Sequence, residues 1–268
     1  VNSLRSDATP GWPWSVYGGT NEAMIETAGV WFVNSVEERF CLLLSCNYFK
    51  ILFDVLTHKL MPEDLLVMGL CDVIRLFTKS ELHPLAKALQ KRWRLICGVS
   101  ANDQGVEREI YHKLSDEQVA NWDDCNSAIG LGFTRSQTSK LVRRIRQFDR
   151  PVSSDMSGWD WSCSFVEMQM GVIDSLKSMQ ICPYDDDDLA SVEILDLSVI
   201  ERLALSDIPL DAQLWHAAMT HNLCMSFAVF MDSNGHLWQQ MSPGIQKSGR
   251  FPTGLLNGRM RSNAAKWV

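Results

Sequence analysis

The stretch PVSSDMSGWDWS, residues Pro151 to Ser162, places two acidic residues five positions apart. Apolar and polar residues alternate from Val152 to Met156, which is the pattern of a strand with one buried face. A glycine then permits a sharp turn, and apolar residues recur at helical spacing from Phe165 to Met179. The stretch therefore predicts a strand that ends at Asp155, a turn, and a helix that begins at or near Asp160.

Two acids at this spacing also have a purely structural interpretation. Asp155 could cap the turn and Asp160 could cap the helix, since aspartate is favoured at both kinds of position. The residues of this stretch alone do not decide between a structural and a functional role for the two acids.

A second informative stretch, GIQKSGRFPTGLLNGRMRSNAAKWV, runs from Gly244 to Val268. Ser248 and Gly249 predict a loop, and Pro252 suits the first turn of a helix. Residues four positions apart share a helix face. On the predicted helix these are Thr253, Asn257 and Arg261. A surface helix with a polar face is the structural alternative.

Two glycines form a neighbouring stripe on the same predicted helix. Gly254 and Gly258 would each cost about 1 kcal/mol relative to alanine inside a helix. We therefore expect another part of the chain to approach the backbone closely there.

A third stretch, from Ile74 to Tyr111, is rich in basic residues. Strands are predicted at residues 73–78 and 93–99, with a loop between them. Three of its cations lie at strand ends or on alternate strand positions, so they can face one way together, and they are Lys79, Arg92 and Arg94. A solvated basic strand edge, which discourages strand pairing, is the structural alternative.

The remaining segments predict a mostly helical chain. Helices are expected at residues 35–60 (one long or two joined), 102–121 and 135–148, and through most of 182–225. Strands at residues 227–232 and 236–241 flank an Asn-Gly turn, which is a hairpin signal. The acidic run Asp185 to Asp188 precedes a helix, so we interpret it as a solvated N-terminal cap.

Composition restricts the class of protein. The chain of 268 residues is 46% hydrophobic and 21% charged, which indicates a globular protein. Its eight cysteines form no CxxC pair, which favours reduced thiols in a cytosolic setting and predicts no zinc site. No uninterrupted apolar run approaches the roughly eighteen residues of a membrane span.

The net charge of -7 would disfavour nucleic-acid binding if it were spread evenly. Basic residues are instead concentrated in residues 75–94 and 135–150, and acids in residues 116–124 and 185–188. Because charges are screened over about 8 Å in physiological salt, the local distribution matters more than the sum.

Taken together, the three stretches resemble the RNA-dependent RNA polymerases of the sobemovirus and polerovirus group. DMSGWD and SGRFPTGLLN match the first two palm motifs of viral polymerases, DxxxxD and SGxxxTxxxN, in that order. The basic stretch is similar to the group's finger segment, with Leu82 in place of its proline. The residues that keep this pattern are Glu81, His83, Lys87, Arg92, Arg94, Asp103 and Gln104.

The resemblance implies an α+β fold, a right-hand polymerase with fingers and a partial palm. Residues 1–150 would form the fingers, 151–180 the first palm motif, 181–241 a helical insertion and hairpin, and 242–268 the second palm motif. The chain is expected to stop before the GDD motif and the thumb.

The resemblance also implies roles for individual residues. Asp155 would be catalytic and would bind Mg²⁺, or Mn²⁺ in its place. The substrate-binding residues would be Lys79, Arg92, Arg94, Asp160, Ser248, Gly249, Thr253 and Asn257. The expected partners are an RNA template, nascent RNA, nucleoside triphosphates and other viral replication proteins, in a replication complex in the host cytoplasm.

Two alternatives remain at this point. A reverse transcriptase is disfavoured by Asp160, because deoxynucleotide polymerases usually place a bulky side chain beside the sugar. A non-catalytic nucleic-acid-binding or structural fragment is the other.

Overall fold

The computed structural model describes residues 4–79, 81–82, 84–90, 93–125, 128–150 and 158–265, and within these ranges the chain is mostly helical. The α-helices are α1 (Asn21–Leu44), α2 (Tyr48–Leu56), α3 (Pro62–Val67), α4 (Leu85–Leu89), α5 (Ala101–Ala120), α6 (Arg135–Ile145), α7 (Trp159–Ser162), α8 (Phe165–Ser178), α9 (Asp186–Glu193), α10 (Leu197–Ala204), α11 (Gln213–Ser226) and α12 (Thr253–Ala265). The strands are β1 (Ile74–Thr78), β2 (Leu95–Gly98), β3 (Val229–Met231) and β4 (Leu237–Gln239).

The four strands form one small mixed sheet in the order β2-β1-β3-β4. The predicted hairpin is confirmed with shorter strands, and its turn is held by Asp232, whose carboxylate accepts the amide protons of Asn234 and His236. The tertiary structure adds a parallel pairing of β1 with β3, with Ile74 opposite Phe230. The basic stretch and the hairpin therefore share one sheet, although about 150 residues separate them in the sequence.

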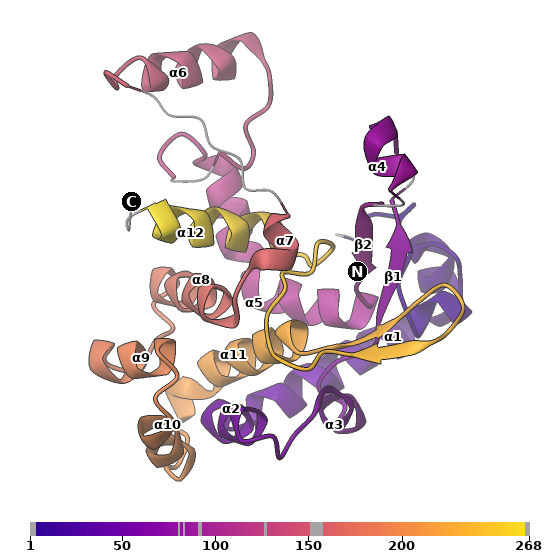
Figure 1. Ribbon diagram of the computed structural model, residues 1–268, viewed down its shortest axis with the longest axis vertical. Coiled ribbons are helices and arrows are strands. Elements are labelled where there is room, and N and C mark those ends of the chain that lie inside the picture. The colour runs from indigo at the N-terminus through magenta and orange to yellow at the C-terminus, as the bar shows by residue number, and fades with distance from the viewer. Residues whose placement is uncertain are drawn as a thin grey trace.

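Helix α11 lies at the centre of the molecule (Figure 1). Every residue from Trp215 to Ser226 is buried, including polar side chains such as His216 and Asn222. Helices α1, α2, α5 and α8 all pack against it. A helix that is surrounded on all sides has no solvent face, so polar residues on it must find partners inside the protein.

The other helices are arranged around this centre (Figure 1). Helix α12 packs on α8, and α10 packs on α2. Met260 of α12 lies so close to Gly171 of α8 that a Cβ at the glycine would be 3.0 Å from its Cγ. The close approach expected at Gly254 is also present, because a Cβ there would lie 3.2 Å from Ile129.

The prediction of one helix from Asp160 to Met179 is wrong. The short helix α7 ends at Ser162, Cys163 is extended, and α8 begins with Ser164 as its N-cap. Ser164 and Glu167 form a capping box, in which each side chain accepts the backbone amide proton of the other residue. This reciprocal pair favours a new helix start over continuation of the first helix.

Other predicted elements are confirmed with changed limits. Residues 35–60 form two helices, because Asn47 caps α2 by accepting the amide proton of Lys50. The predicted loop after β1 contains the short helix α4. The acidic run caps α9 as expected, since Asp185 accepts the amide proton of Asp188.

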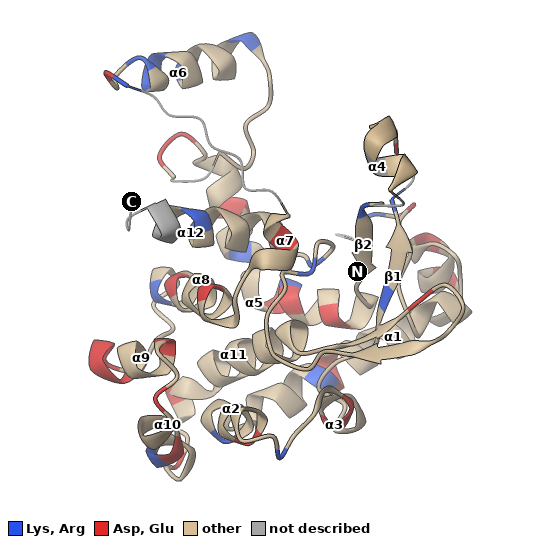
Figure 2. Cartoon of the chain, in the orientation of Figure 1, with Lys and Arg blue, Asp and Glu red and all other residues tan. Residues whose placement is uncertain are grey.

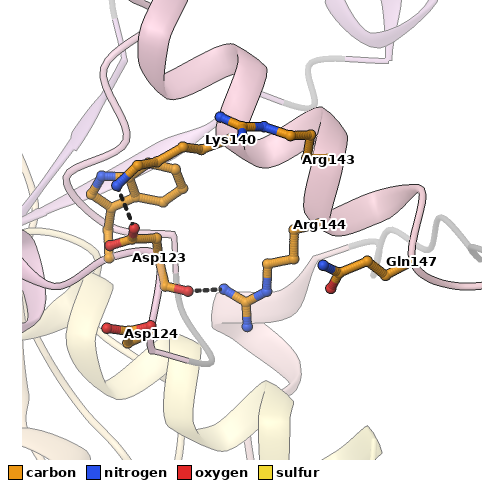
Figure 3. Close-up of a pocket in the computed structure, with 7 residues that line it drawn as sticks. Asp123, Asp124, Lys140, Arg143, Arg144 and Gln147 are labelled. Atoms are coloured by element: carbon orange, nitrogen blue, oxygen red, sulfur yellow. Dashed lines mark hydrogen bonds and ion pairs between the residues drawn. The ribbon is translucent and has the colours of Figure 1, made fainter.

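The basic helix α6 stands apart from the rest of the molecule and none of its residues is buried (Figures 1 and 2). Two of its cations attach it to residues 121–125 (Figure 3). Lys140 pairs with Asp123 at 2.7 Å, and Arg144 donates to the Asp123 carbonyl oxygen at 2.7 Å. An open cavity of about 510 Å³ lies between the two segments.

All eight cysteines are free. In the part of the chain that the structure describes, no helix is both long enough and apolar enough to cross a membrane.

Candidate nucleotide-binding site

The structure describes seven of the eight predicted substrate-binding residues with their neighbours. Asp155, the predicted catalytic residue and metal ligand, lies outside the described residues, as does Arg92. What the structure adds is therefore the arrangement around Asp160, Arg94 and the loop that carries Ser248.

The segment 244–248 runs alongside residues 160–164. Gly244 forms a β-bridge with Ser164. The amide of Ile245 donates to the Cys163 carbonyl oxygen at 3.0 Å, and the amide of Gln246 donates to the Asp160 carbonyl oxygen at 2.7 Å. Backbone hydrogen bonds thus align the turn of the first motif with the loop of the second.

This alignment brings the Ser248 side chain to the Asp160 carboxylate. Partial burial raises the pKa of Asp160, while the positive charge of Arg94 and the hydrogen bond from Ser248 act in the opposite direction. Two other predicted substrate-binding residues, each from a separate stretch of sequence, therefore act on the Asp160 carboxylate.

The cations of the basic stretch are paired with Glu81. Lys79 lies 2.8 Å and Arg94 2.9 Å from its carboxylate oxygens. The two cations hold the pKa of Glu81 below its usual range. The Arg94 side chain is 65% exposed, so a phosphate group can reach it and compete with Glu81.

Gly249 has a backbone conformation that favours glycine, with φ of +124°. A Cβ at this position would collide with the Cys97 carbonyl oxygen of β2. In addition, the Cys97 amide donates to the Ser248 carbonyl oxygen at 3.3 Å. The loop is thus packed directly on the strand that follows Arg94.

The two polar residues on α12 make contacts of a different kind. The Thr253 hydroxyl donates to the carbonyl oxygens of Lys247, at 3.3 Å, and Arg250, at 2.8 Å. Asn257 accepts a hydrogen bond of 3.0 Å from the indole of Trp159, the residue before Asp160. Thr253 therefore stabilises the loop, and Asn257 lies one residue away from the carboxylate.

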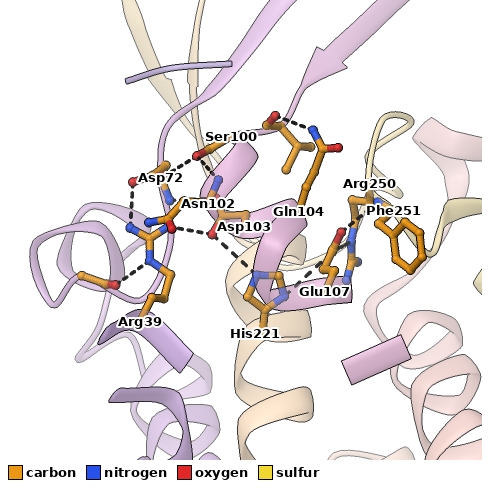
Figure 4. Close-up of polar contacts among 12 residues, drawn as sticks. Arg39, Asp72, Ser100, Asn102, Asp103, Gln104, Glu107, His221, Arg250 and Phe251 are labelled. Carbon is orange, nitrogen blue, oxygen red and sulfur yellow. Dashed lines mark hydrogen bonds and ion pairs between the residues drawn. The ribbon is translucent and has the colours of Figure 1, made fainter. Parts of the chain in front are cut away.

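Sequence reasoning missed the buried polar network behind this loop (Figure 4). Arg250 donates to Glu107 of α5 at 2.5 Å and to Asn222 of α11 at 3.1 Å. His221 lies between Glu107 and Asp103, and Asp103 pairs with Arg39 at 2.9 Å. The position of Arg250 next to the Ser-Gly loop was visible in the sequence, but no sequence signal links it to an acid 143 positions earlier.

The described residues do not by themselves meet the requirements of a metal site. Within the described ranges, no group of three or more His, Cys, Asp or Glu side chains could hold a metal ion. Asp160 is a single carboxylate that is already hydrogen-bonded to Ser248.

An acid-bearing turn aligned with a serine-glycine loop, next to the exposed cations Lys79 and Arg94, is the arrangement expected of a nucleic-acid polymerase. A family model described as viral RNA-directed RNA-polymerase matches residues 47–268. The chain belongs to this family of viral RNA-directed RNA polymerases.

Individual relatives support the same assignment. The chain is 31% identical to the replicase polyprotein P2AB of Cocksfoot mottle virus, over 99% of this chain and 25% of that protein. It is 27% identical to the RNA-directed RNA polymerase of Mushroom bacilliform virus, over 97% of this chain and 54% of that protein. It is also 27% identical to Protein P1-P2 of Potato leafroll virus, over 99% of this chain and 23% of that protein. The chain thus spans between about a quarter and just over half of these relatives.

Proposed function

We propose that this chain forms the nucleotide-selecting part of an RNA-directed RNA polymerase, which copies viral RNA from nucleoside triphosphates. The observation that carries the proposal is the meeting of Asp160, Ser248 and Arg94, since it joins a polar sugar-binding pair to a phosphate-binding cation. In this proposal residues 1–150 belong to the fingers and residues 151–180 and 242–268 to the palm of a right-hand polymerase.

Each group has a distinct role in this proposal. Lys79 and Arg94, together with Arg92, bind the triphosphate, for which a guanidinium offers a two-pronged donor and an ammonium a compact charge. The Asp160 carboxylate and the Ser248 hydroxyl lie where they can hydrogen-bond a ribose hydroxyl, which is both donor and acceptor. Gly249 lets the loop lie against β2, so no side chain intrudes between the two stretches.

Asp155 is the residue of this chain that would bind the catalytic metal. Mg²⁺, or Mn²⁺ in its place, would stabilise the negative charge that develops as the 3′ hydroxyl attacks the triphosphate. A carboxylate at the end of a predicted strand suits an ion that prefers oxygen ligands. We further propose an RNA template and nascent RNA as partners, in a replication complex of the host cytoplasm.

The test is radiolabelled nucleotide incorporation by the full-length polymerase that contains this chain, on an RNA primer and template. We expect incorporation of ribonucleotides, strong rejection of deoxyribonucleotides, and no product from Asp155→Asn. A preference for deoxyribonucleotides would instead indicate a reverse transcriptase. A folded protein that binds RNA and makes no product would indicate a non-catalytic module.

A further inference from the structure

Lys247 is a completely buried lysine immediately before the Ser-Gly pair. Its ammonium group donates to the Gln240 side-chain oxygen at 2.5 Å and to the carbonyl oxygens of Gly244 and Ile245 at 3.0 Å each. An ammonium has three protons, so each one has an oxygen partner. The ring of Phe230 lies beside the same group, with its centroid 5.3 Å from Nζ.

A buried ammonium without a carboxylate partner is costly for folding, because amide and carbonyl dipoles replace water only in part. The three acceptors of Lys247 are all uncharged oxygens. Burial accordingly lowers the pKa of Lys247 to about 7. A residue such as methionine would fill the same space without this cost, so the charge has a role other than packing.

The ammonium fixes the shape of the loop that it belongs to. Its two carbonyl partners, on Gly244 and Ile245, lie in the segment whose amides bond to residues 160–164. Gln240 extends the ring of contacts, because its side-chain amide nitrogen also donates to the Gly244 carbonyl oxygen at 3.2 Å. The Lys247 ammonium therefore cross-links residues 240–247 into one compact loop through hydrogen bonds.

The far side of the Ser-Gly pair is held by a second buried cation, Arg250. Its contacts with Glu107 and Asn222 anchor the loop to α5 and α11 (Figure 4). The carbonyl oxygens of Lys247 and Arg250 both accept from the Thr253 hydroxyl, which joins the two ends of the loop to the first turn of α12. Ser248 and Gly249 thus lie between two buried cations, Lys247 and Arg250, whose side chains are both held by hydrogen bonds.

We propose that Lys247 is a positioning residue for sugar selection, which acts by holding the loop so that Ser248 meets Asp160. The inference rests on the proposed polymerase function and extends it to a residue that touches no substrate. Loss of the ammonium removes one donor from each of its three oxygen partners. The Gln240 oxygen keeps the Ala228 amide and the Gly244 oxygen keeps the Gln240 amide, so the unpaired Ile245 carbonyl oxygen makes the loop shift or open to water. Ser248 then no longer has a fixed place beside Asp160.

The decisive variant is Lys247→Met in the full-length polymerase, because methionine keeps the length and removes the charge. The ribose preference is the kcat/KM for a ribonucleotide divided by the kcat/KM for its 2′-deoxy analogue. We expect this preference to fall about tenfold or more, as in sites that lose a hydrogen bond to a substrate hydroxyl. Affinity for the RNA primer and template should stay within about twofold, because Lys247 is completely buried and cannot contribute a surface phosphate contact. The control is Leu203→Ala, which destabilises α10 far from the loop and should leave the ratio unchanged.

A second measurement does not depend on activity. Hydrogen exchange of residues 244–248 should be about tenfold faster or more in Lys247→Met than in wild type, while α10 exchanges as before. Gln240→Met, which removes one acceptor, should cause a smaller change of the same kind and serves if Lys247→Met does not fold. An unchanged sugar ratio together with unchanged exchange in a folded variant overturns the inference. Absence of any incorporation by the parent polymerase would overturn the proposed function, while the exchange result still decides whether Lys247 holds the loop.

Discussion

Arg94 illustrates how one side chain can connect two parts of the candidate site. It lies at the end of the basic stretch, pairs with Glu81, and its charge acts on Asp160. Before a nucleotide binds, Glu81 keeps two cations close together without a phosphate. In the proposed function, a triphosphate would replace Glu81 as the anion that both cations contact.

We predict that Arg94→Ala raises the KM for nucleotides and changes RNA affinity little. A charge-assisted bond to phosphate contributes about 1.5 to 3 kcal/mol, so the expected increase is roughly ten- to a hundredfold. Steady-state incorporation and RNA binding by fluorescence anisotropy measure the two quantities. Lys177→Ala, which removes another surface cation paired with an acid, is the matched control. Loss of RNA affinity with an unchanged KM would make the basic stretch a template contact.

The proposed sugar contact of Asp160 supports a second prediction at this scale. Asp160→Ala should lower the preference for ribonucleotides by about two orders of magnitude or more, because the hydroxyl then lacks its acceptor. Asn257→Asp should have a weaker effect on the same ratio, since Asn257 contacts Trp159 and only borders Asp160. Competition between labelled ribo- and deoxyribonucleotides measures the ratio directly.

The outcome for each residue distinguishes substrate contact from structural support. A folded Asp160→Ala enzyme with the wild-type ratio would show that Asp160, which lies in the first turn of α7, has only a structural role. For Asn257→Asp, a lower melting temperature with an unchanged ratio would restrict its role to holding Trp159.

At the scale of elements, the loop between β4 and α12 depends on its contact with β2. The Ser248 carbonyl oxygen accepts from the Cys97 amide, and Gly249 lies against the Cys97 carbonyl oxygen. Strand β2 follows Arg94 directly, so the loop is packed on the strand that carries the proposed phosphate-binding arginine at its start.

Gly249→Ala should therefore reduce activity strongly, although it adds only one methyl group. Alanine disfavours a φ of +124°, and its Cβ would meet a backbone oxygen that cannot move independently of the sheet. We expect a fall in kcat/KM of at least about tenfold and a loss of roughly 1 to 3 kcal/mol in unfolding free energy. Gly235→Ala is the control, because that glycine also has positive φ but a Cβ there meets no atom within 4 Å. Equal activity losses in both variants would contradict the role of the β2 contact.

At the scale of the whole molecule, buried polar residues of α11 join distant segments. His216 accepts the Tyr48 amide proton at its Nδ1, at 2.9 Å, and its Nε2 lies 2.6 Å from the Tyr184 hydroxyl. His221, one turn further along, lies between the acids of α5. The central helix thus joins the α2 side of the molecule to the network behind the candidate site.

His216 makes folding stability sensitive to acid. Burial lowers its pKa from the ordinary 6.5 to about 4, because the loss of solvation disfavours the charged ring. Between these two values the unfolded chain binds the proton and the native chain does not, so stability falls as the pH drops from 6.5 toward 4. The loss should reach at most about 3 kcal/mol.

Urea unfolding at pH 7.0 and at pH 4.5 tests this prediction. His216→Gln should be less stable at neutral pH but should lose less stability on acidification than the wild type. His112→Gln, which removes an exposed histidine, should lose as much unfolding free energy between pH 7.0 and pH 4.5 as the wild type. Identical pH dependence in all three proteins would exclude His216 as the source.

Much of the local structure followed from the sequence. Helical periodicity predicted α5 and α6, the Asn-Gly signal predicted the hairpin, and the Ser-Gly pair predicted the loop before α12. These features depend on neighbours within a few residues, so propensity and turn chemistry are sufficient to indicate them. The prediction of one long helix after Asp160 was wrong, because the capping box of Ser164 and Glu167 starts a new helix within the apolar periodicity.

Only the tertiary structure decided which distant residues meet. The pairing of β1 with β3, the contact of Ser248 with Asp160 and the ion pair of Arg250 with Glu107 all join residues that are far apart in the chain. The sequence by itself determined the chemical groups of the candidate site and their order along the chain. Their arrangement came from packing, because contacts between distant elements, such as those that Arg250 makes with α5 and α11, form only when these elements fold against one another.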